Sequence, residues 1–277
     1  MKNENECNEC LRDDLWIWGQ NAGCYHAPRY SYWKVPGSNK MGPVEGAAYL
    51  NIPNCCRVVF DSKPAPPFDS ESEKLSSFRQ VVWSALGDAS SERFDGGKDD
   101  LDEVIRQAEK FPNITGGILD DLFMGGNVRN ARITPERMKE MADRLHHAVR
   151  PLSLWVVYYA TFITEDIDFS AWLDLADVVT FWSWTSRELA NAEQNLHCFI
   201  EKTPGKRHYA GCYLYNFGNR REITDAEMEF QLNLYLKFWK QKKIDGIIVC
   251  ANNIADTGVH AVDIFREWNA AHGNEIR

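Results

Sequence analysis

Short apolar segments alternate with longer amphipathic segments along most of the chain. The apolar segments have the length of buried strands and are bounded by turn residues, and we expect them at residues 15–19, 57–61, 80–85, 114–121, 153–159, 177–184, 207–215 and 246–252. The amphipathic segments between them favour helices at residues 43–51, 70–78, 99–111, 134–149, 169–175, 186–202, 224–243 and 258–271. Regular alternation of strand and helix predicts a parallel sheet with right-handed crossover connections.

The number of repeats favours a closed barrel over an open sheet. Eight strand–helix units in roughly 250 residues are typical of a (β/α)₈ TIM barrel. An open dinucleotide-binding sheet would show GxGxxG after its first strand, whereas residues 18–23 read WGQNAG. The sequence therefore predicts an α/β protein with one (β/α)₈ TIM barrel domain at residues 15–277, preceded by a polar tail at residues 1–14. The long aromatic-rich loop at residues 20–42 is expected to cover one end of the barrel.

Two expected helices carry their own start signals. Thr134 precedes a proline at the first helical position, which is a favoured N-terminal arrangement. Thr224 and Glu227 have the spacing of a capping box, in which each side chain bonds the backbone of the other residue. These signals support the boundaries of the fourth and seventh helices.

Composition and charge limit the possible partners. The 277 residues are 44% hydrophobic with a net charge of −9, which disfavours nucleic acid and anionic membranes because phosphate contacts require clustered Lys and Arg. Residues 1–14 contain no apolar signal-peptide segment, and no run of 18 apolar residues would span a membrane. We therefore expect a cytoplasmic protein without nucleic-acid or membrane partners, and no sequence feature specifies its oligomeric state.

Cysteine and histidine do not form a recognisable metal motif. Cys7 and Cys10 have the CxxC spacing of metal or redox sites, but no second CxxC or His pair follows at finger spacing. Several of the eight cysteines fall in apolar segments, where free thiols are commonly buried. No histidine set converges on the strand ends. The sequence therefore predicts no metal and no cofactor.

Two adjacent aspartates follow the fourth expected strand. The segment at residues 114–123, ITGGILDDLF, runs from apolar residues and two glycines into Asp120 and Asp121. Active sites of TIM barrels lie at the C-terminal ends of the strands. Neighbouring carboxylates there raise each other's pKa, which is typical of functional acids. We therefore interpret Asp120 and Asp121 as the catalytic centre.

The other strand ends supply aromatic and amide side chains. Flat aromatic faces stack on the C–H faces of sugar rings, while carboxylates and amides bond sugar hydroxyls. The pattern therefore predicts an oligosaccharide or glycoside substrate bound at the C-terminal mouth. The candidate binding residues are Trp18, Asp61, Trp83, Tyr158, Trp182, Trp184, Tyr213, Tyr215, Asn216 and Asn252.

The positions of the acids suggest a mechanism. Most glycosidases place two carboxyl groups on different strands, but strands six, seven and eight here end in Trp, Tyr and Asn. A pair on one strand fits substrate-assisted catalysis, in which the sugar's own 2-acetamido group attacks its anomeric carbon. The sequence thus predicts a glycoside hydrolase, with cleavage of an N-acetylhexosaminide as its most specific form.

At this point the chain resembles the β-N-acetylglucosaminidases of the O-GlcNAcase type, whose barrel carries adjacent Asp-Asp at the end of strand four. The wider chitinase-like and hexosaminidase group also has acids on that strand. The resemblance implies that Asp120 orients the acetamide and Asp121 is the general acid. It further implies that Tyr158 or Tyr159 bonds the acetamide oxygen, and that Asn216 or Asn252 binds sugar hydroxyls.

The chain also departs from that family. The family's Trp-Asp-Asp-Ile is Leu-Asp-Asp-Leu at residues 119–122, and its longer strand-seven motif is reduced to residues 215–217, YNF; residues 182–185, WSWT, match a Trp-Thr strand end. These departures bear on N-acetyl specificity more than on glycoside hydrolysis. For a neutral sugar, the second carboxylate would come from Asp61, Asp88, Glu165 or Asp166.

Three further interpretations compete with a glycosidase. A metal-dependent deacetylase would also carry Asp-Asp after a strand, but its HxxxH metal pair is missing from the sequence. A lyase or aldolase barrel needs a lysine on a strand, and Lys63 and Lys206 lie outside the expected strand interiors. A barrel that binds a glycan without catalysis remains the alternative from a different class, and replacing either aspartate by asparagine separates it from an enzyme.

Overall fold

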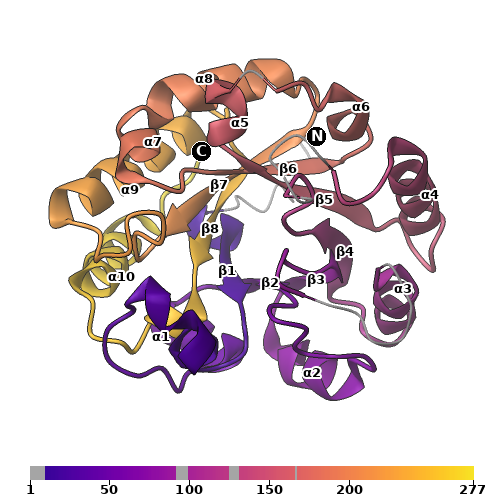
Figure 1. Ribbon diagram of the computed structural model, residues 1–277, viewed down its shortest axis with the longest axis horizontal. Helices are drawn as coiled ribbons and strands as arrows, with labels where there is room; N and C mark the ends of the chain where they lie inside the picture. The colour runs from indigo at the N-terminus through magenta and orange to yellow at the C-terminus, as the bar shows by residue number, and fades with distance from the viewer. Residues whose placement is uncertain (1–9, 92–98, 125–130, 166) are drawn as a thin grey trace, which may run out of the picture.

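The computed structural model describes residues 10–91, 99–124, 131–165 and 167–277 and shows a closed barrel of eight parallel strands (Figure 1). Each strand pairs with the next along the chain, and β1 pairs with β8 to close the ring. This is the predicted (β/α)₈ TIM barrel. The strands are β1 Leu15–Gly19, β2 Asn54–Arg57, β3 Gln80–Leu86, β4 Ile114–Leu119, β5 Ser153–Tyr159, β6 Val178–Trp182, β7 Arg207–Tyr213 and β8 Gly246–Cys250.

Helices surround the barrel on its outside (Figure 1). No helix in the described ranges is both long and apolar enough to cross a membrane. The α-helices are α1 Pro43–Leu50, α2 Asp69–Lys74, α3 Leu101–Lys110, α4 Pro135–His146, α5 Thr161–Thr164, α6 Ser170–Leu173, α7 Ser186–Ala190, α8 Ala192–Lys202, α9 Asp225–Lys240 and α10 His260–His272. Short 3₁₀ helices are η1 Leu11–Asp14, η2 Cys24–His26, η3 Pro28–Trp33, η4 Leu75–Ser77 and η5 Asn252–Ile254.

The prediction for the second strand was wrong. The strand expected at residues 57–61 is β2, Asn54–Arg57, and it ends where the expected strand begins. Cys55 and Cys56 pack as small buried apolar residues between β1 and β3. Asp61 lies beyond the strand in a turn and has a left-handed backbone with φ of 57°.

Large aromatic side chains fill the barrel interior. Trp16 of β1, Trp155 of β5 and Tyr209 of β7 meet with ring centroids 4.8 to 6.0 Å apart. Glycines on neighbouring strands make room for these rings. A Cβ atom on Gly246 would approach the Tyr209 ring to 2.6 Å, and one on Gly211 would overlap the Trp182 ring. The aromatic interior therefore depends on strand glycines.

Residues 10–14, which the sequence places in the polar tail, pack against the C-terminal end of the chain. Cys10 forms a β-bridge with Ile276, and the backbone N–H of Leu11 donates to the carbonyl of Glu275 at 2.9 Å. The Leu11 side chain is fully buried. Because η1 leads into β1, this packing covers the end of the barrel where the strands begin.

Candidate active site

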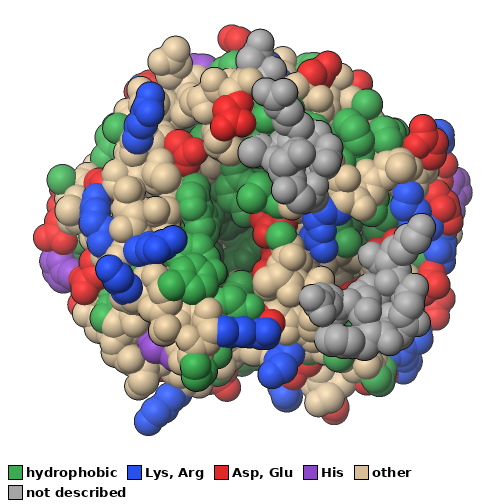
Figure 2. Space-filling view, viewed as in Figure 1, with side chains coloured by type: hydrophobic (Ala, Val, Ile, Leu, Met, Phe, Trp, Pro, Cys, Tyr) green, Lys and Arg blue, Asp and Glu red, His purple; other side chains and the backbone are tan. Residues whose placement is uncertain are grey.

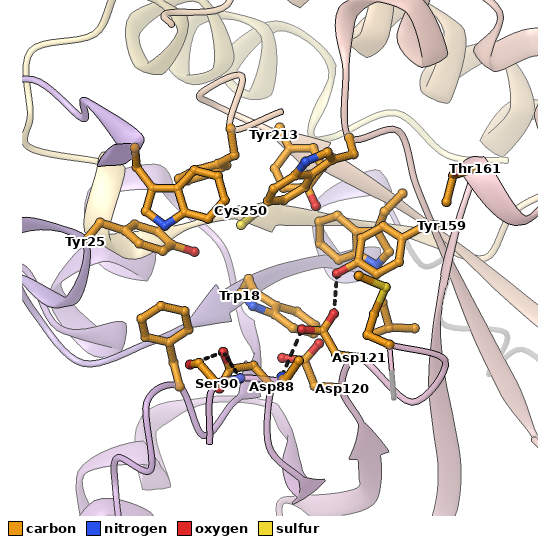
Figure 3. Close-up of a pocket in the computed structure, with 18 of the residues that line it drawn as sticks. Trp18, Tyr25, Asp88, Ser90, Asp120, Asp121, Tyr159, Thr161, Tyr213 and Cys250 are labelled. Carbon is orange, nitrogen blue, oxygen red and sulfur yellow. Dashed lines mark hydrogen bonds between the residues drawn. The ribbon is translucent and has the colours of Figure 1, made fainter. Parts of the chain in front are cut away.

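The turn after β4 places both aspartates at the C-terminal mouth of the barrel (Figure 3). The Asp120 N–H donates to the carbonyl of Leu86 on β3, so this residue continues the strand edge. Asp121 adopts a left-handed backbone with φ of 46°, which ends the strand direction abruptly. The Arg132 guanidinium donates to the Asp120 carbonyl oxygen at 3.0 Å and fastens the turn. Both side chains line the same pocket.

The surroundings of the two carboxyl groups favour their protonated forms. Burial raises the pKa of Asp120 well above its usual range, and the nearby Asp121 and Asp88 carboxyls raise it further. Burial also raises the pKa of Asp121, against the lowering effect of two donors. Those donors are the Ala89 N–H at 3.1 Å and the Tyr159 hydroxyl at 2.8 Å. The pair can therefore keep a proton above the ordinary pKa of an aspartate.

Asp88 is the third acid of the group, and hydrogen-bond donors surround its carboxylate. It accepts from the Asp61 N–H at 3.1 Å and from both the N–H and the hydroxyl of Ser90. The Ser91 hydroxyl is a fourth donor. The Asp88 carboxyl in turn contributes to the raised pKa of both Asp120 and Asp121.

The pocket above the acids has a volume of about 610 Å³ and mainly aromatic walls. In the space-filling view it is a central hollow with hydrophobic side chains inside and acidic atoms at its edge (Figure 2). Such a site buries the faces of a ligand and fixes it with a few polar groups. The aromatic lining residues are Trp18, Tyr25, Tyr30, Tyr32, Trp33, Phe60, Tyr159, Trp182, Trp184, Tyr213 and Phe217.

The loop between β1 and α1 supplies four of those aromatic residues, as its sequence predicted. Tyr25 packs on Phe217 with ring centroids 4.7 Å apart and so joins this loop to the opposite wall. The Asn39 side chain bonds the Gly23 N–H and the Asn252 carbonyl, which ties the loop to the segment after β8. The wall formed by this loop is therefore held in place by the body of the barrel.

Comparisons with known proteins agree with this architecture. No protein-family model and no curated protein sequence matches the chain. Among solved structures, a putative α-L-fucosidase from Bacteroides thetaiotaomicron superimposes with a TM-score of 0.55 at 11% identity, over 94% of this chain and 96% of that one. The chain shares its TIM-barrel fold with that enzyme.

Other solved TIM barrels are similar to the same degree. An active-site mutant of the Rhizomucor miehei β-1,3-glucanosyltransferase, in complex with laminaritriose, has a TM-score of 0.53 at 11% identity over 87% of both chains. A probable 2-pyrone-4,6-dicarboxylic acid hydrolase from Acinetobacter baumannii also gives 0.53, at 12% identity over 95% of this chain and 90% of that chain. These TM-scores show a shared fold. Sequence identities this low carry no information about the reaction, because one fold supports many activities.

Six of the twelve residues nominated from the sequence meet in the pocket. Besides the two acids, they are the inward-facing aromatic residues at the ends of β1, β6 and β7. Trp18 and Trp182 lie edge to face at 5.2 Å, and Trp182 lies 5.1 Å from Tyr213. The full set is Trp18, Asp120, Asp121, Trp182, Trp184 and Tyr213.

Two nominated aromatic residues point away from the barrel interior. Trp83 is fully buried outside the pocket, where its ring stacks on Phe68 with centroids 4.3 Å apart. Tyr158 is buried among Phe123, Phe162 and Phe199. Its neighbour Tyr159 is the tyrosine of this pair that lines the pocket. Successive strand residues face opposite sides, and this alternation separates the two tyrosines.

The remaining nominated residues hold loops together. Asp61 pairs with Arg29 outside the pocket lining. The Tyr215 hydroxyl donates to the backbone carbonyls of Trp33 and Lys34. Asn252 bonds the backbone of Gln20 and Met41, and Asn216 bonds Ser186. The structure gives each of these side chains protein partners and leaves them away from the ligand space.

Several lining residues were absent from the sequence-based set. Tyr159, Glu188, Tyr25, Phe60 and Phe217 all reach the pocket. Tyr159 was named in the sequence only as the alternative to Tyr158, and alternation along a strand that is buried on both faces does not tell which of the two faces the pocket. The other four lie in loops or at a helix start, where no periodic pattern indicates direction. In the described residues, no three His, Cys, Asp or Glu side chains converge as metal ligands; Cys7 lies outside those residues, and the Cys10 thiol bonds Asp13.

Proposed function

We propose that the protein is a glycoside hydrolase that acts at this pocket. The observation that carries the proposal is the adjacent buried pair Asp120 and Asp121, with raised pKa values, at the base of an aromatic pocket. Glycoside hydrolysis needs a carboxylic acid that is still protonated at working pH. Aromatic faces bind the sugar ring by stacking. This pocket combines both requirements.

The more specific form of the proposal is substrate-assisted cleavage of an N-acetylhexosaminide. The acetamide oxygen of the bound sugar bonds to its anomeric carbon as the glycosidic C–O bond breaks, and Asp121 gives its proton to the leaving oxygen. Water then adds to the anomeric carbon as the bond between that carbon and the acetamide oxygen breaks, which restores the acetamide group, and the water gives a proton to Asp121. The Asp120 carboxylate accepts a hydrogen bond from the acetamide N–H. That bond would favour the ionised form of Asp120, so the proton of the pair is left on Asp121.

Cleavage of a neutral sugar with two separate carboxylates is the second candidate. Among the acids considered for this role, Asp61 lies outside the pocket, Asp166 lies outside the described residues, and Asp88 is saturated by donors. Glu165 favours the candidate, because it lines the pocket and its carboxylate has no partner in the described part of the chain. Glu165→Gln should abolish turnover only in this mechanism.

Hydrolysis of 4-nitrophenyl and 4-methylumbelliferyl glycosides tests the proposal. We expect Asp121→Asn to lower kcat by about 10²- to 10⁴-fold, the usual contribution of a general acid, while the variant still binds sugar. Asp102→Asn is the matched control, because Asp102 is an exposed aspartate on α3 that pairs with Arg144; its activity should equal that of the wild type.

The pattern of substrates distinguishes the mechanisms. Cleavage confined to N-acetylhexosaminides and inhibited by a thiazoline supports substrate assistance. Cleavage of neutral sugars alone supports the two-carboxylate mechanism. Equal rates for wild type and Asp121→Asn would contradict the assignment of the active site. Sugar binding without any hydrolysis would instead indicate a glycan-binding barrel.

A further inference from the structure

Glu188 brings a carboxylate to the pocket that the mechanism above does not use. It lies in α7, directly after β6, and forms a capping box with Thr185. One carboxylate oxygen, Oε2, accepts from the backbone N–H of Trp184 at 2.6 Å and of Thr185 at 3.0 Å. These two bonds fix the side chain to the same turn that carries Trp184 into the pocket wall.

The second oxygen of Glu188, Oε1, has no partner among the described residues. Glu227 occupies the same position in the capping box of α9 but differs in its hydrogen bonds. Both oxygens of Glu227 are occupied, by Arg221 and by Thr224. A capping box needs only one carboxylate oxygen. The free oxygen of Glu188 is therefore available to a ligand, whereas Glu227 does not line the pocket.

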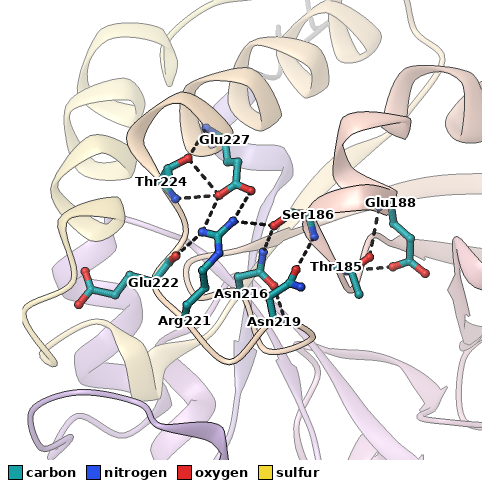
Figure 4. A network of polar contacts seen from close by, with 9 residues as sticks. All are labelled: Thr185, Ser186, Glu188, Asn216, Asn219, Arg221, Glu222, Thr224 and Glu227. Atoms are coloured by element: carbon teal, nitrogen blue, oxygen red, sulfur yellow. Dashed lines mark hydrogen bonds and ion pairs between the residues drawn. The ribbon is translucent and has the colours of Figure 1, made fainter.

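The loop that carries Glu188 is held rigidly by the neighbouring loop after β7 (Figure 4). The Ser186 hydroxyl accepts from Asn216 at 2.7 Å and from Arg221 at 2.7 Å, and the Ser186 N–H donates to Asn219 at 2.8 Å. Preorganised polar groups bind with less entropic cost than mobile ones. The position of the carboxylate is thus set before any ligand enters.

Trp184 and Tyr213 complete this side of the pocket. The Trp184 ring stacks on Phe217 at 5.9 Å and meets Tyr213 edge to face at 5.6 Å. Trp184, Glu188 and Tyr213 all line this pocket. The hydroxyl of Tyr213 has no partner in the described part of the chain, although the residue is 7% exposed. An aromatic face with a fixed acceptor beside it suits a sugar ring.

We infer that Glu188 binds the sugar: its free carboxylate oxygen accepts a hydrogen bond from a hydroxyl or ammonium group of the ring that packs on Trp184. This inference rests on the proposed function only in taking the ligand to be a sugar. It also predicts which sugars the pocket selects. A carboxylate binds hydroxyl or ammonium donors and repels uronate, sulfate or phosphate groups at the same position.

Glu188→Gln tests the inference without removing the helix cap. The amide oxygen can accept from Trp184 and Thr185 as before, but an NH₂ donor replaces the free acceptor. Losing a charge-assisted hydrogen bond should raise Kd and KM about tenfold or more, with kcat within about threefold of the wild type. Glu193→Gln is the control, because Glu193 is an exposed glutamate on α8 that pairs with Lys237 away from the pocket; it should leave Kd and KM unchanged.

Binding and turnover are measured separately. Titration calorimetry in the Asp121→Asn background uses 4-methylumbelliferyl glycosides of N-acetylglucosamine, glucose and galactose, and hydrolysis is followed in otherwise wild-type protein. Weakened binding by Glu188→Gln supports the inference even when no glycoside is cleaved, which would refute only the hydrolase proposal. Unchanged Kd and KM overturn the inference and leave the hydrolase intact. A large loss of kcat at constant KM also overturns the inference, because it would show that Glu188 acts in the chemical step. If the protein binds none of these glycosides, both the inference and the hydrolase proposal are overturned.

Discussion

The carboxyl group of Asp120 occupies an environment that opposes its charge. It is 5% exposed and lies near the Asp121 and Asp88 carboxyls, and these conditions raise its pKa well above the usual range. Because the pKa of Asp120 is higher in the folded state, the unfolded chain loses this proton at a lower pH than the folded protein does. The contribution of Asp120 to stability is therefore fully present below the unfolded pKa and is lost as pH rises through the folded pKa. The buried Asp120 carboxyl should therefore cost stability at neutral pH.

Replacing Asp120 by asparagine should stabilise the protein at pH 7. Asn keeps the shape of the side chain but has no charge to bury, so we expect a higher Tm for Asp120→Asn than for wild type. The difference should shrink as pH falls toward about 4, the unfolded pKa of aspartate. Thermal unfolding at several pH values measures it. A Tm difference that grows on acidification would contradict the raised pKa. The variant should also lose activity, because residues at functional sites commonly reduce stability in return for activity.

At the scale of elements, sequence periodicity located seven of the eight strands and placed Asp120 and Asp121 directly after β4. It misplaced β2 because the valines at 58 and 59 have stronger strand preference than the buried cysteines at 55 and 56. It also selected Tyr158 as a binding residue, whereas Tyr159 lines the pocket, because in a strand that is apolar on both faces either alternation satisfies the pattern. Loop residues such as Glu188 depend on tertiary contacts that no local pattern encodes.

The pairing of a glycine with a tryptophan across β6 and β7 gives a prediction at this scale. Gly211 is the register partner of Trp182, and a Cβ atom there would overlap the indole ring that lines the pocket. Gly211→Ala should therefore destabilise the fold by about 1–3 kcal/mol, the usual cost of overpacking. It should also weaken sugar binding, because Trp182 must move.

Gly117→Ala on β4 is the matched control for that substitution. Its added Cβ would lie 3.3 Å from Ala85 and farther from Leu145, which is a tight but feasible contact. We expect a smaller loss of stability and unchanged binding. Urea unfolding and calorimetry on both variants give the comparison. If both variants lost similar amounts of stability and binding, any methyl group added to a strand glycine would be disruptive, and the Gly211–Trp182 pair would have no special role.

At the scale of the whole molecule, the two ends of the barrel carry different tasks. The mouth holds the acids and the aromatic pocket, whereas the opposite end is closed by the η1 segment against the C-terminal residues. Asp14 joins these segments, since it accepts from the Trp239 indole N–H at 2.7 Å and pairs with Arg277 at 3.2 Å. In TIM barrels the catalytic face and the stabilising face are commonly separated in this way.

Leu11→Ala tests that separation. Leu11 is fully buried in the closing segment, and truncating such a leucine usually costs about 2–5 kcal/mol. We therefore expect a clear loss in the free energy of unfolding, measured with urea, and wild-type kcat and KM at 25 °C, where the barrel is still folded. Phe217→Ala is the counterpart at the mouth, because Phe217 packs on Trp184 and Tyr25 in the pocket wall; it should raise KM. If Leu11→Ala raised KM as strongly as Phe217→Ala while folded, the two ends would be coupled through the aromatic interior, and the separation would fail.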